Sequence, residues 1–174
     1  MDIFVVKTSE AENVEDSLLA KFQKKEISNF EKRKEHCFSY LMLDRILKEV
    51  YKIENREIIF DDVKPKLKQG GKYFSLSHSK GYIALGFSDS DCGIDIEGVN
   101  SDKNWQAIAK RMKFNSQTLE EFYVDWTKYE AEYKLNSQIK QLYSAKIDNY
   151  ILTAVSENLN EKFDLFIETK KGAF

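Results

Sequence analysis

The chain has 174 residues, 42% of them hydrophobic and 13% aromatic, which is enough to bury one good core or two small cores that share an interface. Its 27 Lys and Arg residues nearly balance its 29 Asp and Glu residues, so the net charge of −2 gives no basic field for nucleic acid or an anionic membrane. No segment approaches the roughly 20 apolar residues of a membrane span, and the two cysteines form neither a disulfide framework nor a zinc pattern, so we expect a soluble, cytoplasmic protein.

The beginning of the chain predicts a short strand and a long helix. The strand covers residues 3–7. The helix is expected over residues 28–51, because Ser28 and Glu31 fit a capping box. Four apolar residues farther along follow the i, i+3, i+4, i+7 spacing of a buried stripe: Leu43, Ile46, Leu47 and Val50.

Strands dominate the middle of the chain. Residues 64–71 form a lysine-rich loop with the only proline and a Gly-Gly pair. Three strands follow over residues 73–77, 82–87 and 92–97. Short turns separate them, so we expect an antiparallel meander.

The remainder predicts two helices and two strands. One helix starts near residue 104 and the next covers residues 116–135, while strands are expected over residues 150–155 and 163–167. Each half of the chain supplies helix and then strand, in an alternation too irregular for a doubly wound sheet. We therefore expect an α+β fold with two related halves.

The third strand of the meander carries two adjacent carboxylates. Ile94 and Ile96 would face a core, while Asp95 and Glu97 share the other face. Carboxylates this close repel one another unless a cation lies between them, and a hard divalent ion with oxygen ligands meets that need. Taken alone, the motif is more simply interpreted as a solvent-facing edge with two acids.

The helix over residues 116–135 carries a second candidate group. Trp126, Glu130 and Lys134 lie at i, i+4 and i+8, so they share one helix face. Trp126 would anchor that face in the core, with Glu130 and Lys134 projecting beyond it. Without other motifs, Glu130 and Lys134 would be interpreted as a weak surface ion pair.

A histidine at the end of the first meander strand is the third candidate. Phe74 and Leu76 face one way and Ser75 and Ser77 the other, while His78 lies beside a Ser-Lys-Gly turn that could hold an anion. A structural, hydrogen-bonded histidine is the alternative. No G-x-S-x-G elbow supports a hydrolase, and no Walker A loop or G-x-G-x-x-G is present. Two basic clusters, of a kind that is usually solvated, are Lys32, Arg33, Lys34 and Arg45, and Lys64, Lys66, Lys68 and Lys72.

In their order along the chain, these motifs resemble those of the 4'-phosphopantetheinyl transferase superfamily. The matching segments lie within residues 28–134: Lys64-Pro65, then residues 74–79, 93–97, 108–111 and 126–131, closing on Lys134. Single-chain members activate carrier domains of peptide synthetases and carriers of fatty acid synthesis, and they are pseudo-dimers of two similar α+β halves. The resemblance implies halves over residues 1–98 and 99–174, each a small antiparallel sheet packed with helices, with the active site between them.

The resemblance also implies the ligands and their contacts. Asp95, Glu97 and Glu130 would hold Mg²⁺, with Mn²⁺ as an alternative, together with the pyrophosphate of coenzyme A (CoA). The resemblance also implies that Ser77 contacts CoA. His78 would bind the 3'-phosphate with the help of Lys32, Arg33 or Arg45. Lys64 and Pro65 would line the adenine pocket, and Lys134 would meet the pyrophosphate.

The implied activity is that of a holo-acyl-carrier-protein synthase. It transfers 4'-phosphopantetheine from CoA to a serine of an acyl carrier protein or carrier domain and releases 3',5'-ADP. Lys134 and the metal would neutralise phosphate oxygens, while Glu130 takes the serine proton directly or through water. With Asp95 and His78 these residues form the expected catalytic set. We expect a monomer that binds neither nucleic acid nor membrane.

Two departures from the family pattern keep other functions open. Tyr129 stands where the family has a lysine, and the neighbouring Lys128 lies about 100° around the helix. The short segment between Lys134 and Tyr150 predicts that the second half lacks a hairpin found in larger relatives. The alternatives are a non-catalytic protein that binds CoA or a carrier protein, and a magnesium-dependent phosphohydrolase.

Overall fold

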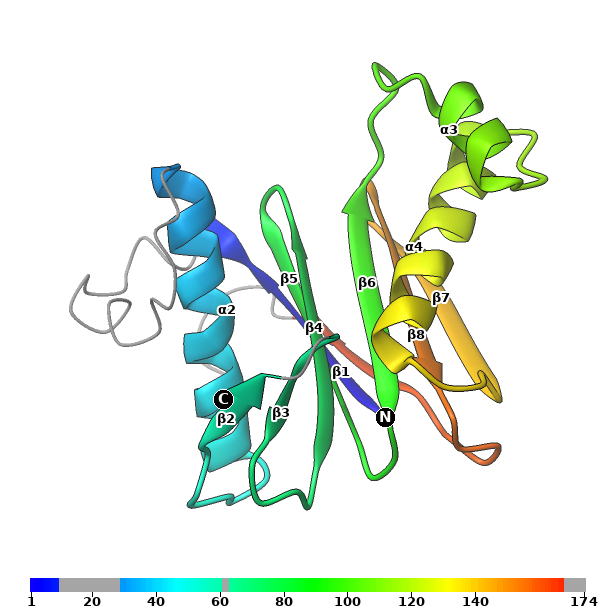
Figure 1. Cartoon of the computed structure of the whole chain (residues 1–174). Coiled ribbons are helices and arrows are strands. Elements are labelled where there is room, and N and C mark those ends of the chain that lie inside the picture. Colours follow the sequence, from blue (N-terminus) through cyan, green and yellow to red (C-terminus); the bar gives the residue numbers. More distant parts are fainter. Residues whose placement is uncertain (10–28, 61–62, 168–174) are drawn as a thin grey trace.

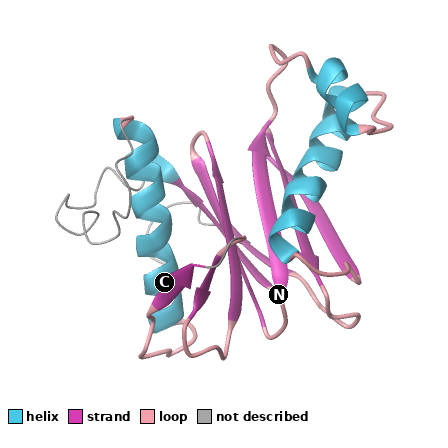
Figure 2. Ribbon diagram, viewed as in Figure 1, coloured by secondary structure: helices cyan, strands magenta, loops and turns pink. Residues whose placement is uncertain are grey.

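The computed structural model describes residues 1–9, 29–60 and 63–167 of the chain. These residues form an α+β fold with small sheets, as the sequence predicts. Two sheets stack face to face, and helices cover their outer faces (Figures 1 and 2). No helix within these three ranges combines the length and the apolar character needed to cross a bilayer.

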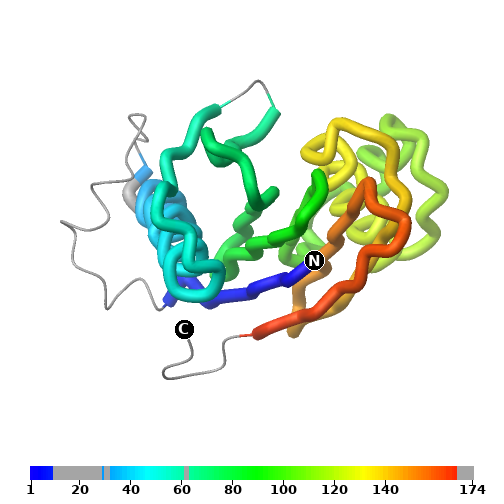
Figure 3. Tube along the Cα trace, turned by 90° about the horizontal axis from the view of Figure 1, so that it is seen from below, coloured from blue at the N-terminus to red at the C-terminus, as the bar shows by residue number. Residues whose placement is uncertain are grey.

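The first sheet has four strands in the order β4-β5-β1-β9. β1 (Asp2–Lys7) lies antiparallel to β5 (Tyr82–Ser88) and parallel to β9 (Asp164–Ile167), so segments from opposite ends of the chain lie side by side (Figure 3). β4 (Tyr73–Ser79) is an edge strand and pairs antiparallel with β5. α2 (Phe30–Glu49) covers the outer face of this sheet and buries an apolar stripe against it.

The second sheet has three antiparallel strands in the order β6-β8-β7: β6 (Cys92–Gly98), β8 (Tyr150–Ser156) and β7 (Gln141–Ile147). α4 (Leu119–Leu135) covers its outer face, and α3 (Trp105–Met112) packs beside α4 (Figure 1). The inner faces of the two sheets form a second core, to which both Ile94 and Ile96 contribute as the sequence predicts. Its other buried members include Ile3, Val5, Ala84, Leu152 and Ala154.

Apart from β9, the strands of the two sheets and the long helix on each follow one order along the chain, with β2 (Ile58–Phe60) and β3 (Pro65–Leu67) inserted in the first series and α3 in the second. β1, α2, β4 and β5 follow that order along the chain in the first sheet, and β6, α4, β7 and β8 in the second. In each set the last strand lies between the other two and is antiparallel to both. The predicted division between residues 98 and 99 stays a prediction, and β6, which it assigns to the first half, shares a sheet with β7 and β8.

The predicted three-stranded meander is wrong in its third strand. β4 and β5 do pair as antiparallel neighbours, but β6 pairs with β8. The reason lies in β5, which already has β4 on one edge and β1 on the other and so offers no free edge to β6.

Three strands were missed: β2, β3 and β7. β7 forms a hairpin with β8, so the second half does contain a hairpin between Lys134 and the end of β8. The predicted loop over residues 64–71 contains β3 (Pro65–Leu67), which pairs antiparallel with β2 (Ile58–Phe60) as a separate two-stranded sheet. The Gly-Gly turn follows β3, and Gly70 and Gly71 adopt positive φ values of 71° and 95° there.

The ends of α2 also differ from the prediction. Asn29 is the N-cap, because its side chain accepts the backbone N–H of Lys32 at 2.9 Å. The predicted capping residue Ser28 lies outside the described residues. At the other end, Val50 follows the last helical turn and is 41% exposed, so the buried stripe ends with Leu47.

Candidate functional site

Asp95 of β6 is a buried carboxylate with one satisfied and one unsatisfied oxygen. Only 5% of the residue is exposed. Its Oδ1 accepts hydrogen bonds from Ser77 Oγ (2.7 Å) and Lys134 Nζ (2.8 Å). Its Oδ2 is buried and has no hydrogen-bond partner in the described part of the chain. Because an unpaired buried carboxylate oxygen is costly, this atom is suited to binding a cation.

Lys134 reaches Asp95 because α4 packs closely against β6. Gly93 lies under the helix, where a Cβ atom would stand 1.9 Å from the carbonyl oxygen of Ala131. Only glycine therefore allows the helix to approach this strand. Lys134 also donates to the carbonyl oxygen of Ile94 at 2.9 Å, which fixes its ammonium group at the strand.

Glu97 and Glu130 share the electrostatic field of Asp95. Burial raises the pKa of Glu97 and the charge of Asp95 adds to that rise, while a hydrogen bond from Ser79 (3.0 Å) opposes it. Burial and Asp95 likewise raise the pKa of Glu130, and here Lys134 opposes the shift. Asp95 thus repels both glutamates, and the charges of Lys134 and, at Glu97, of Lys103 do not cancel the rise in either pKa.

These three carboxylates have the donor chemistry of a hard divalent cation site, because Mg²⁺ prefers oxygen ligands. The fit rests on the unpartnered Oδ2 of Asp95 and on two neighbouring carboxylates with raised pKa values. As the side chains stand, the described residues contain no group of three His, Cys, Asp or Glu side chains that could hold a metal ion.

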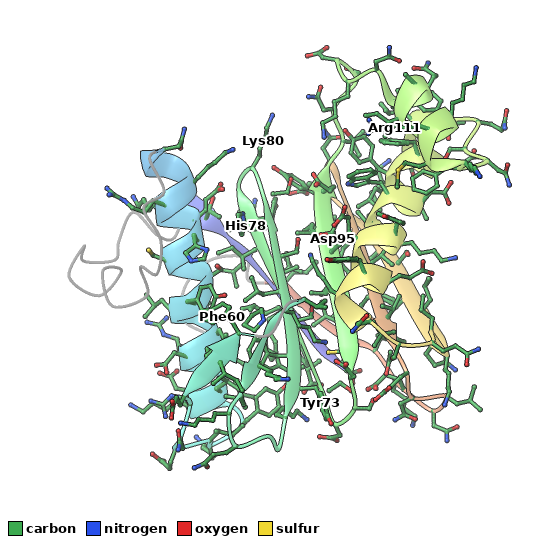
Figure 4. The ribbon with its side chains drawn as sticks, in the orientation of Figure 1. Phe60, Tyr73, His78, Lys80, Asp95 and Arg111 are labelled. Carbon is green, nitrogen blue, oxygen red and sulfur yellow. The ribbon has the colours of Figure 1, made fainter. Side chains whose placement is uncertain are left out.

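His78 lies on the face of β4 that is turned toward α2, and Figure 4 shows it at a height similar to that of Asp95. Its Nδ1 is 3.7 Å from Glu35 Oε2 on α2. Burial has the largest effect on the pKa of His78 and lowers it. The charges of Glu35 and Asp95 raise this pKa, whereas those of Lys134 and Lys32 lower it. His78 is thus electrostatically linked to the carboxylate group from the other side of β4.

The basic residues predicted on α2 do not all lie near His78. Lys32, in the first turn, contributes to the field at His78. Arg33 follows it in the same turn. Arg45 is exposed and lies 13 residues after Lys32, which is about 20 Å along the axis of α2. Lys32 and Arg33 therefore lie at the same end of α2, whereas Arg45 is remote.

Lys64 and Pro65 lie toward the other end of β6. Lys64 Nζ donates to the Asp91 carboxylate and to the carbonyl oxygen of Cys92. Cys92 precedes Asp95 by three residues in β6, so Lys64 contacts the strand about 10 Å from Asp95. A cavity of about 400 Å³ lies beside Lys64, and its lining includes four lysines and the Gly-Gly turn: Lys64, Lys66, Lys68, Gly70, Gly71 and Lys72.

Tyr129, which stands where the motifs that the sequence resembles have a lysine, belongs to an aromatic cluster on α4. Its ring lies 6.3 Å from Trp126 and 6.2 Å from Phe114, measured between centroids. Trp126 is partly buried in the same cluster, as its predicted anchoring role requires. Tyr129 itself is 43% exposed. Its aromatic side chain supplies no positive charge at this position.

Three residues that contact the candidate site were not assigned a role from the sequence. Ser79 donates to Glu97, Ser75 accepts the backbone N–H of Ile94 at 3.1 Å, and Glu35 faces His78. A signal for the serines was available, since serines at every second residue of a strand leave the same face. Glu35 gave none, because only the packing of α2 on β4 brings it to His78.

The candidate site therefore spans β4, β6 and α4 and combines carboxylates, an ammonium group, serine hydroxyls and an imidazole. Such a group can bind a divalent cation together with phosphate. No protein-family model matches the chain, and a search of curated proteins finds no match. The site chemistry and the resemblance of its motifs are the basis for a functional assignment.

Proposed function

We propose that this chain is a magnesium-dependent transferase that moves the 4'-phosphopantetheine group of CoA onto a serine of a carrier protein, in the manner of the 4'-phosphopantetheinyl transferases that its motifs resemble. The observation that carries the proposal is the contact between β6 and α4. It brings Lys134 to Asp95, whose buried Oδ2 has no hydrogen-bond partner in the described residues, and it leaves Glu97 and Glu130 in the electrostatic field of Asp95.

The arrangement of the sheets supports the same proposal. The two sets, β1-α2-β4-β5 and β6-α4-β7-β8, have the common connection order and strand order expected of two related halves, with the division before β6 instead of after residue 98. Ser77 and His78 come from β4 of the first set, while the carboxylates and Lys134 come from β6 and α4 of the second. In this proposal the active site lies where the two halves of a pseudo-dimer meet.

Asp95, Glu97 and Glu130 are the residues that would hold Mg²⁺. When bound, the ion supplies positive charge to the pyrophosphate oxygens of CoA, which would otherwise repel an incoming nucleophile. Lys134 adds a second positive charge at the same place. His78 donates a hydrogen bond to the 3'-phosphate, with Lys32 and Arg33 at the same end of α2 to balance its charge.

Glu130 acts as the general base. Its carboxylate takes the serine proton directly or through water. The serine oxygen then forms a bond to the phosphorus nearest the pantetheine arm. The bond between that phosphorus and the bridging oxygen breaks, and 3',5'-ADP leaves with the electron pair.

Intact mass spectrometry tests this function. The chain is mixed with CoA, Mg²⁺ and an apo acyl carrier protein, and the carrier is weighed. We expect a gain of one phosphopantetheine, abolished by EDTA and by Asp95→Ala. Glu132→Ala is the control, because Glu132 is an acid of α4 outside the proposed site and pairs with Lys128 at 3.8 Å.

A non-catalytic protein that binds CoA or a carrier protein is the second candidate. The aromatic environment of Tyr129 favours it, since a cation expected at the phosphates is replaced there. Binding of CoA without any mass gain on several carriers, and without dependence on Glu130, would select this function over the transferase.

A further inference from the structure

β4 and β6 lie side by side at the junction of the two sheets, yet neither belongs to the other's ladder of paired strands. Three serine hydroxyls of β4 make the connection. Ser75 accepts a backbone N–H of β6 at 3.1 Å, Ser77 donates to Asp95 at 2.7 Å, and Ser79 donates to Glu97 at 3.0 Å. We call these three residues the serine row.

Asp95 and Glu97 each accept one hydrogen bond from the serine row. Ser77 binds Oδ1 of Asp95 and leaves Oδ2 without a partner. Ser79 binds Oε2 of Glu97, and no hydrogen bond from the described residues reaches Oε1. Each carboxylate is therefore held by one oxygen from the first sheet, and its other oxygen remains available.

The hydroxyl of Ser79 has a defined orientation. It accepts the backbone N–H of Gly98 at 3.1 Å, so its single hydrogen is directed to Glu97. Ser75 differs in kind, because it contacts only the backbone N–H of Ile94 and no carboxylate. The same strand thus has two serines that donate hydrogen bonds to carboxylates and one that accepts a hydrogen bond from the backbone.

We propose that Ser77 and Ser79 are positioning residues that orient Asp95 and Glu97 toward a divalent cation, so that the first sheet sets the cation affinity of a site in the second. This inference rests on the proposed magnesium function. For Ser77 it replaces a predicted contact with CoA by a contact with the carboxylate, and for Ser79 it assigns a role where the sequence assigned none.

The test measures Mn²⁺ binding to the full chain in the absence of CoA and carrier protein. The electron paramagnetic resonance signal of free Mn²⁺ reports how much of the ion is bound. Hydrogen-bond partners of metal ligands typically contribute about 10-fold to 100-fold in affinity. We expect Ser77→Ala and Ser79→Ala each to weaken Mn²⁺ binding by about 10-fold or more. Ser79→Thr, which keeps the hydroxyl and suits a strand, should restore it.

Ser75→Ala is the matched control. It removes a buried hydroxyl from the same strand, so it should lower the unfolding midpoint in urea while leaving the Mn²⁺ affinity unchanged. Weakening by Ser75→Ala equal to that of the other two variants would contradict the positioning role, because a general loosening of the junction would then explain all three.

The remaining outcomes separate this inference from the proposed function. Wild-type affinity in both Ser77→Ala and Ser79→Ala, with affinity lost in Asp95→Ala, would overturn the positioning role and leave the metal site standing. A wild-type chain that binds no Mn²⁺ would contradict the magnesium function and the positioning role together.

Discussion

The two oxygens of the Asp95 carboxylate have opposite surroundings. Oδ1 receives two hydrogen bonds, one of them from an ammonium group, and Oδ2 receives none. A folded protein rarely leaves a buried acceptor in this condition without a functional reason. At the scale of single residues, the carboxylates of this site are expected to reduce the stability of the metal-free protein.

Glu130→Gln tests this conflict between function and stability. Burial and Asp95 raise the pKa of Glu130 above its unfolded value, so the stability it contributes is present at low pH and is lost as the pH rises through the folded pKa. In EDTA at pH 7, Glu130→Gln should therefore be more stable to urea than wild type, with the advantage disappearing below about pH 4.

The same substitution should reduce the rate of the proposed transfer by about 100-fold or more, since it removes the proposed general base. Glu132→Gln on the same helix serves as control and should change neither property appreciably. Full transfer activity in Glu130→Gln would refute the assignment of Glu130, whatever its stability.

His78 offers a test that needs no catalysis. Its pKa is lowered, first by burial, so the imidazole should titrate below the usual value of about 6.5 in an NMR titration. A bound 3'-phosphate would favour the protonated ring, so CoA should raise the pKa while 3'-dephospho-CoA should not. His36, the other histidine of the chain, is the internal control. An equal rise with both ligands would contradict contact between His78 and the 3'-phosphate.

Among the elements, the approach of α4 to β6 determines whether the site can form. Gly93→Ala would place a methyl group against the Ala131 backbone and force the helix away. We expect a loss of about 3 kcal/mol in unfolding free energy, measured in urea, together with weaker Mn²⁺ binding.

Gly86→Ala is the matched control for this change. It also adds a methyl group to a buried strand, but its nearest neighbour is the flexible side-chain sulfur of Met1 at 3.2 Å. The loss should be smaller and Mn²⁺ binding unaffected. A Gly93→Ala chain with wild-type Mn²⁺ affinity would show that close packing of α4 is unnecessary for the site.

Elements with strong local signals were predicted well. The strand at residues 3–7, the helices after Asn104 and up to Leu135, and the strand carrying Asp95 all match the structure closely. β7 was missed because it alternates between half-buried and exposed residues along most of its length and lacks an apolar run. The partner of β6 could not be read from neighbouring turns, since Asp95 pairs with Thr153 far along the chain.

For the whole molecule, the sequence predicted which residues face together on one element but not how elements meet. The common face of Asp95 and Glu97 follows from strand alternation, and the common face of Glu130 and Lys134 from helix periodicity. The hydrogen bond from Lys134 to Asp95 depends on the packing of α4 on β6. The distance between Arg45 and Lys32 depends on the axial rise along α2. Such relations arise from tertiary structure and have no local signature.

The most direct test of the whole account is the stoichiometry of one reaction. The chain is incubated with CoA, Mg²⁺ and an excess of apo carrier protein, and both modified carrier and free 3',5'-ADP are quantified. The account predicts equal amounts of the two products and no 3',5'-ADP when the carrier is omitted. Release of 3',5'-ADP without modification of the carrier would contradict it and identify the chain as a phosphohydrolase.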